Sequence, residues 1–131
     1  MQFYKKSHPI IKMNQFLLYG VLGVLMMLLD LPWLYVSAER WQESIKRIQG
    51  GLPARFDWRW GIPTYFAMGY LASMATTVNG AFWHGLATYA VFDGTNLALF
   101  KKYPVDLAIA DTIWGGILFS ITFLARKWLR I

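Results

Sequence analysis

The chain has 131 residues, of which 56% are hydrophobic, 18% aromatic and only 15% charged, whereas soluble domains are roughly 25% charged. This composition indicates a membrane protein, and the net charge of +6 comes from Lys and Arg at the ends of apolar runs, which favours lipid headgroups over nucleic acid as the partner. The chain contains no Cys, which excludes disulfides and thiolate metal sites.

Four apolar segments have the length and composition of membrane helices. A span needs about 20 predominantly apolar residues. The first segment has no charge other than Asp30, and this Asp together with Pro32 argues against a cleaved signal peptide. We therefore predict an all-α, polytopic integral membrane protein, a single domain over residues 1–131, with four transmembrane helices at about 16–37, 61–78, 81–100 and 105–124.

A short amphipathic helix is predicted between the first two spans, at about 38–49. Trp41, Ile45 and Ile48 recur at helical spacing on one face, and charged residues occupy the other. Such a helix fits the membrane interface. Gly50-Gly51 is expected to end it.

Three acidic residues lie inside the apolar segments. Asp30 precedes the end of its span by seven residues, Asp93 does the same, and Asp111 follows the start of its span by six residues. These three span ends face the same side, so at about 1.5 Å per residue each carboxyl group lies roughly 10 Å from that side. The sequence thus predicts one carboxylate layer in a four-helix bundle.

Each acid has possible hydrogen-bond donors on its own helix. Trp33 and Trp114 follow Asp30 and Asp111 by three residues. The third span places Tyr89, Asp93 and Asn96 on one face, with Thr95 alongside. An isolated charge in hydrocarbon is costly, so at least one or two of the acids are expected to be protonated unless a cation lies between them.

Two functional interpretations compete. In one, the acids only fix helix packing, as in an accessory subunit of a membrane assembly or a self-associating protein. In the other, they bind a cation or relay protons, because acids at membrane depth are often functional. A lipid-modifying enzyme using the same acids is a lesser alternative. No P-loop, GxSxG or HExxH motif is present, which favours a non-enzymatic protein.

No metal or cofactor is predicted. The chain has only two histidines, His8 and His84, and His84 stands alone in its span. The expected partners are the lipid bilayer and other membrane subunits or further copies of the chain, without nucleic acid. Orientation is unresolved, because six Lys and Arg lie on the side of the termini and seven on the side of the longer loops.

These polar residues resemble a known family, the small four-span membrane proteins of domain-of-unknown-function family 2177. The similar features are Asp30-x-x-Trp33-Leu34, Thr88-Tyr89, Asp93-x-Thr95-Asn96-Leu97 and Asp111-x-x-Trp114-Gly115. The family usually has a Tyr before the second Asp, a Leu after it, and Trp-Pro in the last loop, where this chain has Phe92, Gly94 and Tyr103-Pro104. The resemblance implies four helices with an inward polar layer, and it implies no activity.

Overall fold

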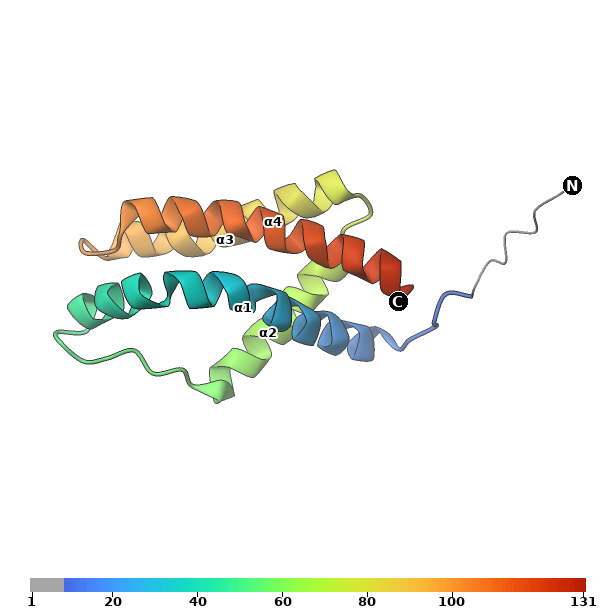
Figure 1. Cartoon of the computed structure of the whole chain (residues 1–131), viewed down its shortest axis with the longest axis horizontal. Helices are drawn as coiled ribbons and strands as arrows, with labels where there is room; N and C mark the ends of the chain where they lie inside the picture. The colour runs from blue at the N-terminus through green and yellow to red at the C-terminus, as the bar shows by residue number, and fades with distance from the viewer. Residues whose placement is uncertain (1–8) are drawn as a thin grey trace, which may run out of the picture.

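The computed structural model describes residues 9–131, shown as a ribbon in Figure 1. His8 and two of the lysines counted on the side of the termini, Lys5 and Lys6, lie outside these residues. Four helices account for 97 of the 123 described residues, which confirms the all-α prediction. They are α1 (Gln15–Ile48), α2 (Trp58–Ser73), α3 (Val78–Leu99) and α4 (Val105–Leu129).

The helix α1 corrects one prediction. We expected a separate interfacial helix after residue 37, but α1 continues without a break to Ile48. The reason is local: Ser37 and Ser44 are buried and donate their hydroxyls to the carbonyls of Trp33 and Arg40, at 2.6 and 2.8 Å, so neither needs an end of the helix to satisfy it. The helix ends as predicted at Gly50 and Gly51, whose positive φ values of 65° and 100° suit glycine.

The boundary between α2 and α3 also differs from the prediction. Asn79-Gly80 was expected to form a turn between two spans, but it lies in the first turn of α3. The hydroxyl of Thr77 caps this helix by accepting a hydrogen bond from the backbone N–H of Gly80 at 2.9 Å. As a result α2 ends at Ser73 and has only 16 residues, about 24 Å of helix.

Two of the helices in the described part of the chain, α1 and α4, are long and apolar enough to cross a membrane. They have 34 and 25 residues. A bilayer core is about 30 Å thick, so α2, with about 24 Å of helix, is shorter than this thickness.

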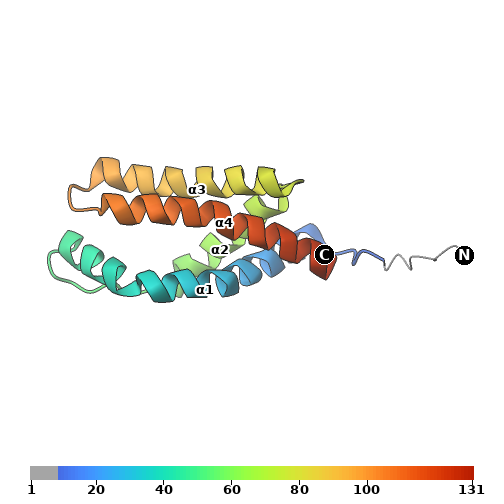
Figure 2. The ribbon, with the colours of Figure 1, turned by 45° about the horizontal axis from the view of Figure 1, so that its top comes forward.

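The helices form two pairs, α1 with α2 and α3 with α4, and the pairs meet along α1 and α4 (Figures 1 and 2). Glycines allow close approach within each pair. A Cβ at Gly69 of α2 would collide with the backbone of Tyr19 in α1, and a Cβ at Gly85 of α3 would collide with the carbonyl of Gly115 in α4. These backbone contacts are typical of membrane helices that pack through small residues.

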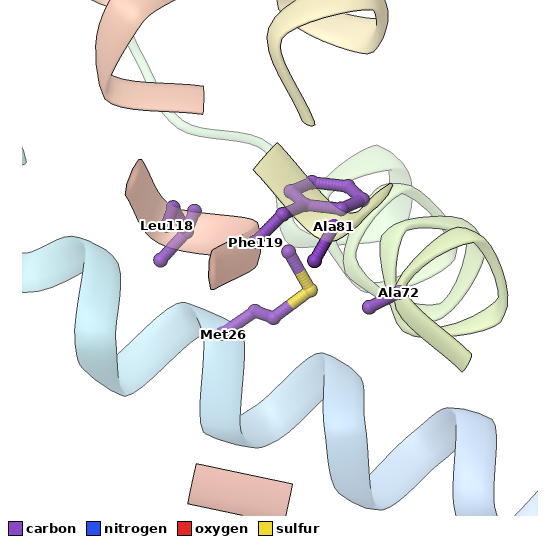
Figure 3. Packing of buried hydrophobic residues seen from close by; sticks show 5 residues of the cluster. All are labelled: Met26, Ala72, Ala81, Leu118 and Phe119. Carbon is purple, nitrogen blue, oxygen red and sulfur yellow. The ribbon is translucent and has the colours of Figure 1, made fainter. Parts of the chain in front are cut away.

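The apolar core lies where all four helices meet. Met26 of α1 and Phe119 of α4 are fully buried, and Ala72 of α2 and Ala81 of α3 close the cluster with Leu118 (Figure 3). This cluster lies one to two helical turns from the acidic residues of α1 and α4, on the side of the chain termini. It therefore positions the polar layer without contributing to its chemistry.

Candidate functional site

The acids of α1 and α4 exchange hydrogen-bond donors. The indole N–H of Trp33 in α1 donates to Asp111 Oδ1 of α4 at 2.6 Å, and the indole N–H of Trp114 in α4 donates to Asp30 Oδ1 of α1 at 2.7 Å. The two indole rings stack with centroids 5.9 Å apart and an angle of 21° between their planes. The sequence predicted donors on the same helix, but each Asp takes its donor from the opposite helix.

A second donor to Asp30 comes from α2. The hydroxyl of Tyr65 donates to Asp30 Oδ2 at 2.9 Å, so both carboxylate oxygens accept a hydrogen bond. Tyr65 was not among the predicted donors, because it lies 35 residues from Asp30 in the span with the vaguest polar pattern. Its hydroxyl at membrane depth was the only available signal.

The carboxylate of Asp93 is held from the loop between α3 and α4. Tyr103 in this loop donates to Asp93 Oδ1 at 2.9 Å, and Thr112 of α4 donates to Asp93 Oδ2 at 3.2 Å. Burial raises the pKa of the Tyr103 phenol, and its hydrogen bond to Asp93 raises it further, so Tyr103 remains a protonated donor. Neither Tyr103 nor Thr112 was predicted, although both lie next to positions that the sequence singled out.

The acid of α3 lies next to the exchange between α1 and α4. Thr112, which donates to Asp93, directly follows Asp111 on α4. This contact joins Asp93 to the two acids of α1 and α4. Through these bonds all four helices contribute to one connected layer.

Three other predicted residues have different surroundings. The Tyr89 ring packs against Gly115, and its hydroxyl makes no hydrogen bond to a carboxylate within residues 9–131. Asn96 lies near Tyr103, whose hydroxyl donates to Asp93. Thr95 is exposed and donates to the carbonyl of Val91 at 2.6 Å, which places it outside the layer.

The layer is closed. Asp30, Asp93 and Asp111 are 5%, 1% and 7% exposed, which leaves them almost no contact with the surroundings of the protein. One groove of about 210 Å³ between α3 and α4 reaches the edge of Asp93 and Thr112, and its other lining residues are apolar or glycine. Within residues 9–131 there is no group of three or more His, Cys, Asp or Glu side chains arranged to hold a metal ion.

The other candidate ligand, His84, does not enter the layer. Its ring stacks on Phe119, with centroids 6.1 Å apart and an interplanar angle of 23°. It is thus a packed aromatic residue of the α3–α4 interface.

An all-helical fold with two apolar helices of spanning length and acids sealed in its interior defines the class: this is a small integral membrane protein. Residues 61–126 match the family described as "Predicted membrane protein (DUF2177)". The chain belongs to this family, as its polar residues predicted. No curated protein and no solved structure matches the chain.

Proposed function

We propose that the protein is a non-enzymatic structural component of its membrane, an accessory subunit or a self-associating protein. In this proposal the carboxylate layer holds the α1–α2 pair against the α3–α4 pair. The observation that carries the proposal is the exchange of donors between Trp33, Asp111, Trp114 and Asp30. A substrate-binding acid would instead need access from the membrane or from water.

Energetics support this role. Hydrogen bonds between membrane helices average about 0.6 kcal/mol and reach about 1.7 kcal/mol. Asp30 and Asp93 each accept two hydrogen bonds and Asp111 accepts one, so the connected set can fix one arrangement of the helix pairs. The stacked indoles of Trp33 and Trp114 also keep water from the acids on α1 and α4.

The first test measures assembly in native membranes. Because the chain has no Cys, a single Cys at exposed Val91, on the lipid-facing side of α3, gives a clean crosslinking probe in native membranes. We expect crosslinks to a second copy or another subunit, and we expect Asp30→Leu to lower both their yield and the thermal stability. Glu39→Gln, at an exposed carboxylate side chain of α1 outside the layer, is the matched control and should change neither.

A second candidate function, proton handling, is favoured by one observation: Asp93 borders the groove between α3 and α4, and Asp111 lies nearby on α4. Two neighbouring carboxyl groups beside such a groove have the minimum chemistry of a proton relay. In this alternative, Asp93→Asn leaves the fold and the Val91 crosslinks intact but abolishes proton flux in liposomes that carry a pH-sensitive dye.

The two functions give opposite results in that assay. The structural role predicts no proton flux from the parent protein and a loss of thermal stability in Asp93→Asn. Flux in the parent that disappears in a stably folded Asp93→Asn variant would reject the structural proposal.

A further inference from the structure

We propose that the loop between α3 and α4, residues 100–104, is a lid that separates Asp93 from water, and that the end of α1 holds this lid closed. Figures 1 and 2 show the end of α1 and the loop at the same end of the molecule. The proposal concerns access to Asp93, so it goes beyond the structural role of the carboxylate layer and does not depend on it.

The cover of Asp93 differs from that of the other two acids. Those two accept hydrogen bonds from side chains within α1, α2 and α4. Asp93 accepts one from Thr112 of α4 and one, at 2.9 Å, from Tyr103 in the loop. Loops open locally at a lower cost in free energy than helices in a packed core. Asp93 can therefore be uncovered without separating the helices.

The Tyr103 side chain bridges the loop and the carboxylate. Asp93 lies six residues before the end of α3 at Leu99, which is about 9 Å of helix. The Tyr103 hydroxyl reaches Asp93 Oδ1, and the residue as a whole is 8% exposed. Its neighbours Lys101 and Lys102 are exposed, and lysines at the end of a span lie on the water side of the interface. Displacing Tyr103 would thus open Asp93 toward water.

The start of α4, next to the loop, lacks a capping side chain. Pro104 occupies the N-cap position and makes no side-chain hydrogen bond, whereas each of the other three helices has a side-chain cap. Within the loop, the N–H of Tyr103 donates to the carbonyl of Phe100 at 3.2 Å, the long end of the usual range. The loop therefore needs support from another element to stay over Asp93.

The end of α1 gives that support through two adjacent residues. Arg40 donates to Asp106 Oδ2 in the first turn of α4 at 2.6 Å. The centroid of the Trp41 ring lies 5.7 Å from that of the Tyr103 ring. Ser37, one turn before Trp41, is only 4% exposed, so this face of α1 is covered. Because α1 continues past Ser37 without a break, it reaches both contacts.

Both contacts are of moderate strength, which suits a lid that opens. The side chains of Arg40 and Asp106 are 55% and 70% exposed, and an exposed ion pair changes an equilibrium about twofold. A contact between aromatic rings, such as that of Trp41 with Tyr103, changes it about fivefold. Loss of both contacts should therefore raise the population of the open loop roughly tenfold.

The experiment measures how fast a water-soluble carbodiimide labels each acid. Full-length protein in lipid nanodiscs is treated with the carbodiimide and glycine methyl ester, and peptide mass spectrometry locates the labels. In the parent, we expect Asp93 to be labelled before Asp30 and Asp111, because only its cover includes a loop. Arg40→Gln with Trp41→Ala should label Asp93 roughly tenfold faster and leave the other two rates within about twofold.

The matched control is Arg59→Gln with Trp60→Ala at the start of α2. It makes the same two substitutions in an adjacent Arg and Trp, and it also removes an ion pair, that of Arg59 with Asp57 at 2.7 Å. Trp60 is 74% exposed, so the control tests the loss of these side chains away from the lid. We expect it to leave the labelling of Asp93 at the rate of the parent.

A rise at Asp93 alone, absent from the control, supports the proposal. The proposal is overturned if the parent labels all three acids together, if the α1 variant leaves Asp93 unchanged, or if the control or the other two acids show the same rise. If the α1 variant loses helicity by circular dichroism, Trp41→Phe replaces it. This variant keeps a ring against Tyr103 and should raise the labelling of Asp93 about twofold.

Discussion

The helices within a pair and the helices between pairs are held together by different means. Within the pairs, backbone meets backbone at Gly69 and Gly85, where no side chain lies between the helices. Between the pairs, α1 meets α4 through the indoles and carboxylates of Trp33, Asp111 and Trp114 with Asp30. Small residues therefore select which helices pair, and the polar residues select how the pairs face each other.

The largest expected effect is at the backbone contacts within a pair. Gly69→Ala would drive a Cβ into the backbone of Tyr19 and Gly23, and backbone cannot move aside as a side chain can. We expect a loss of about 3 kcal/mol in the free energy of unfolding, despite the better helix propensity of Ala. Thermal unfolding in detergent, followed by circular dichroism, measures it.

The control for this change is Gly20→Ala on α1. A Cβ there meets nothing within 4 Å, so the same substitution should be neutral or slightly stabilising. If both variants unfold at the same temperature, close approach does not explain the pairing of α1 with α2.

The next effect tests the contact between the pairs. Asp30→Leu leaves the Trp114 indole and the Tyr65 hydroxyl without an acceptor, and we expect a loss of about 2 kcal/mol. Asp30→Asn keeps one acceptor oxygen and should lose about half as much. Equal stability of the two variants in chemical denaturation would mean that Asp30 contributes through its shape alone.

A smaller effect is expected in the loop between α3 and α4. Tyr103→Phe removes one hydrogen-bond donor to Asp93 but keeps the ring, whose centroid lies 5.7 Å from that of the Trp41 ring. We expect a loss of about 1 kcal/mol. Tyr35→Phe, at a side chain that is 86% exposed on α1, removes the same hydroxyl and should change nothing. A loss of the same size at Tyr35 would contradict a specific role for Tyr103.

The smallest effect concerns the start of α2, outside both kinds of contact. The hydrogen bonds from Arg59 hold the pKa of Asp57, which caps this helix, below its usual range. The capping stabilisation is thus complete above about pH 4 and is lost as the pH falls through the lowered pKa. Hydrogen exchange at the Arg59 amide should accelerate, relative to its intrinsic rate, in that acidic range. Asp57→Asn, which caps without titrating, should remove this pH dependence.

Much of the fold could be predicted because the hydropathy of a segment is a local property of the sequence. Hydropathy predicted the four helices, and Gly50-Gly51 predicted the end of α1. The break expected after Ser37 was wrong because a change from apolar to charged residues marks a change of surroundings and does not itself stop a helix. The boundary at Ser73 was missed because Thr77, rather than Asn79-Gly80, sets the start of α3.

The candidate site was predicted only in part, for a geometric reason. Span ends fix the depth of a residue, so the sequence placed Asp30, Asp93 and Asp111 in one layer. Depth does not reveal which helices are neighbours or how each is rotated. The donors on other elements, Tyr65, Tyr103 and Thr112, therefore could not be identified, and the exchange of indoles between α1 and α4 could not be foreseen.

The exchange of indole donors between α1 and α4 is tested most directly by nuclear magnetic resonance of the tryptophan indole N–H groups in detergent. The chain has seven Trp, and Trp→Phe variants assign the signals of Trp33 and Trp114. If donors are exchanged between α1 and α4, Asp111→Asn shifts and deprotects mainly the Trp33 signal, and Asp30→Asn mainly that of Trp114. If Asp30→Asn instead moves the Trp33 signal and leaves Trp114 unchanged, each Asp pairs within its own helix and the account is wrong.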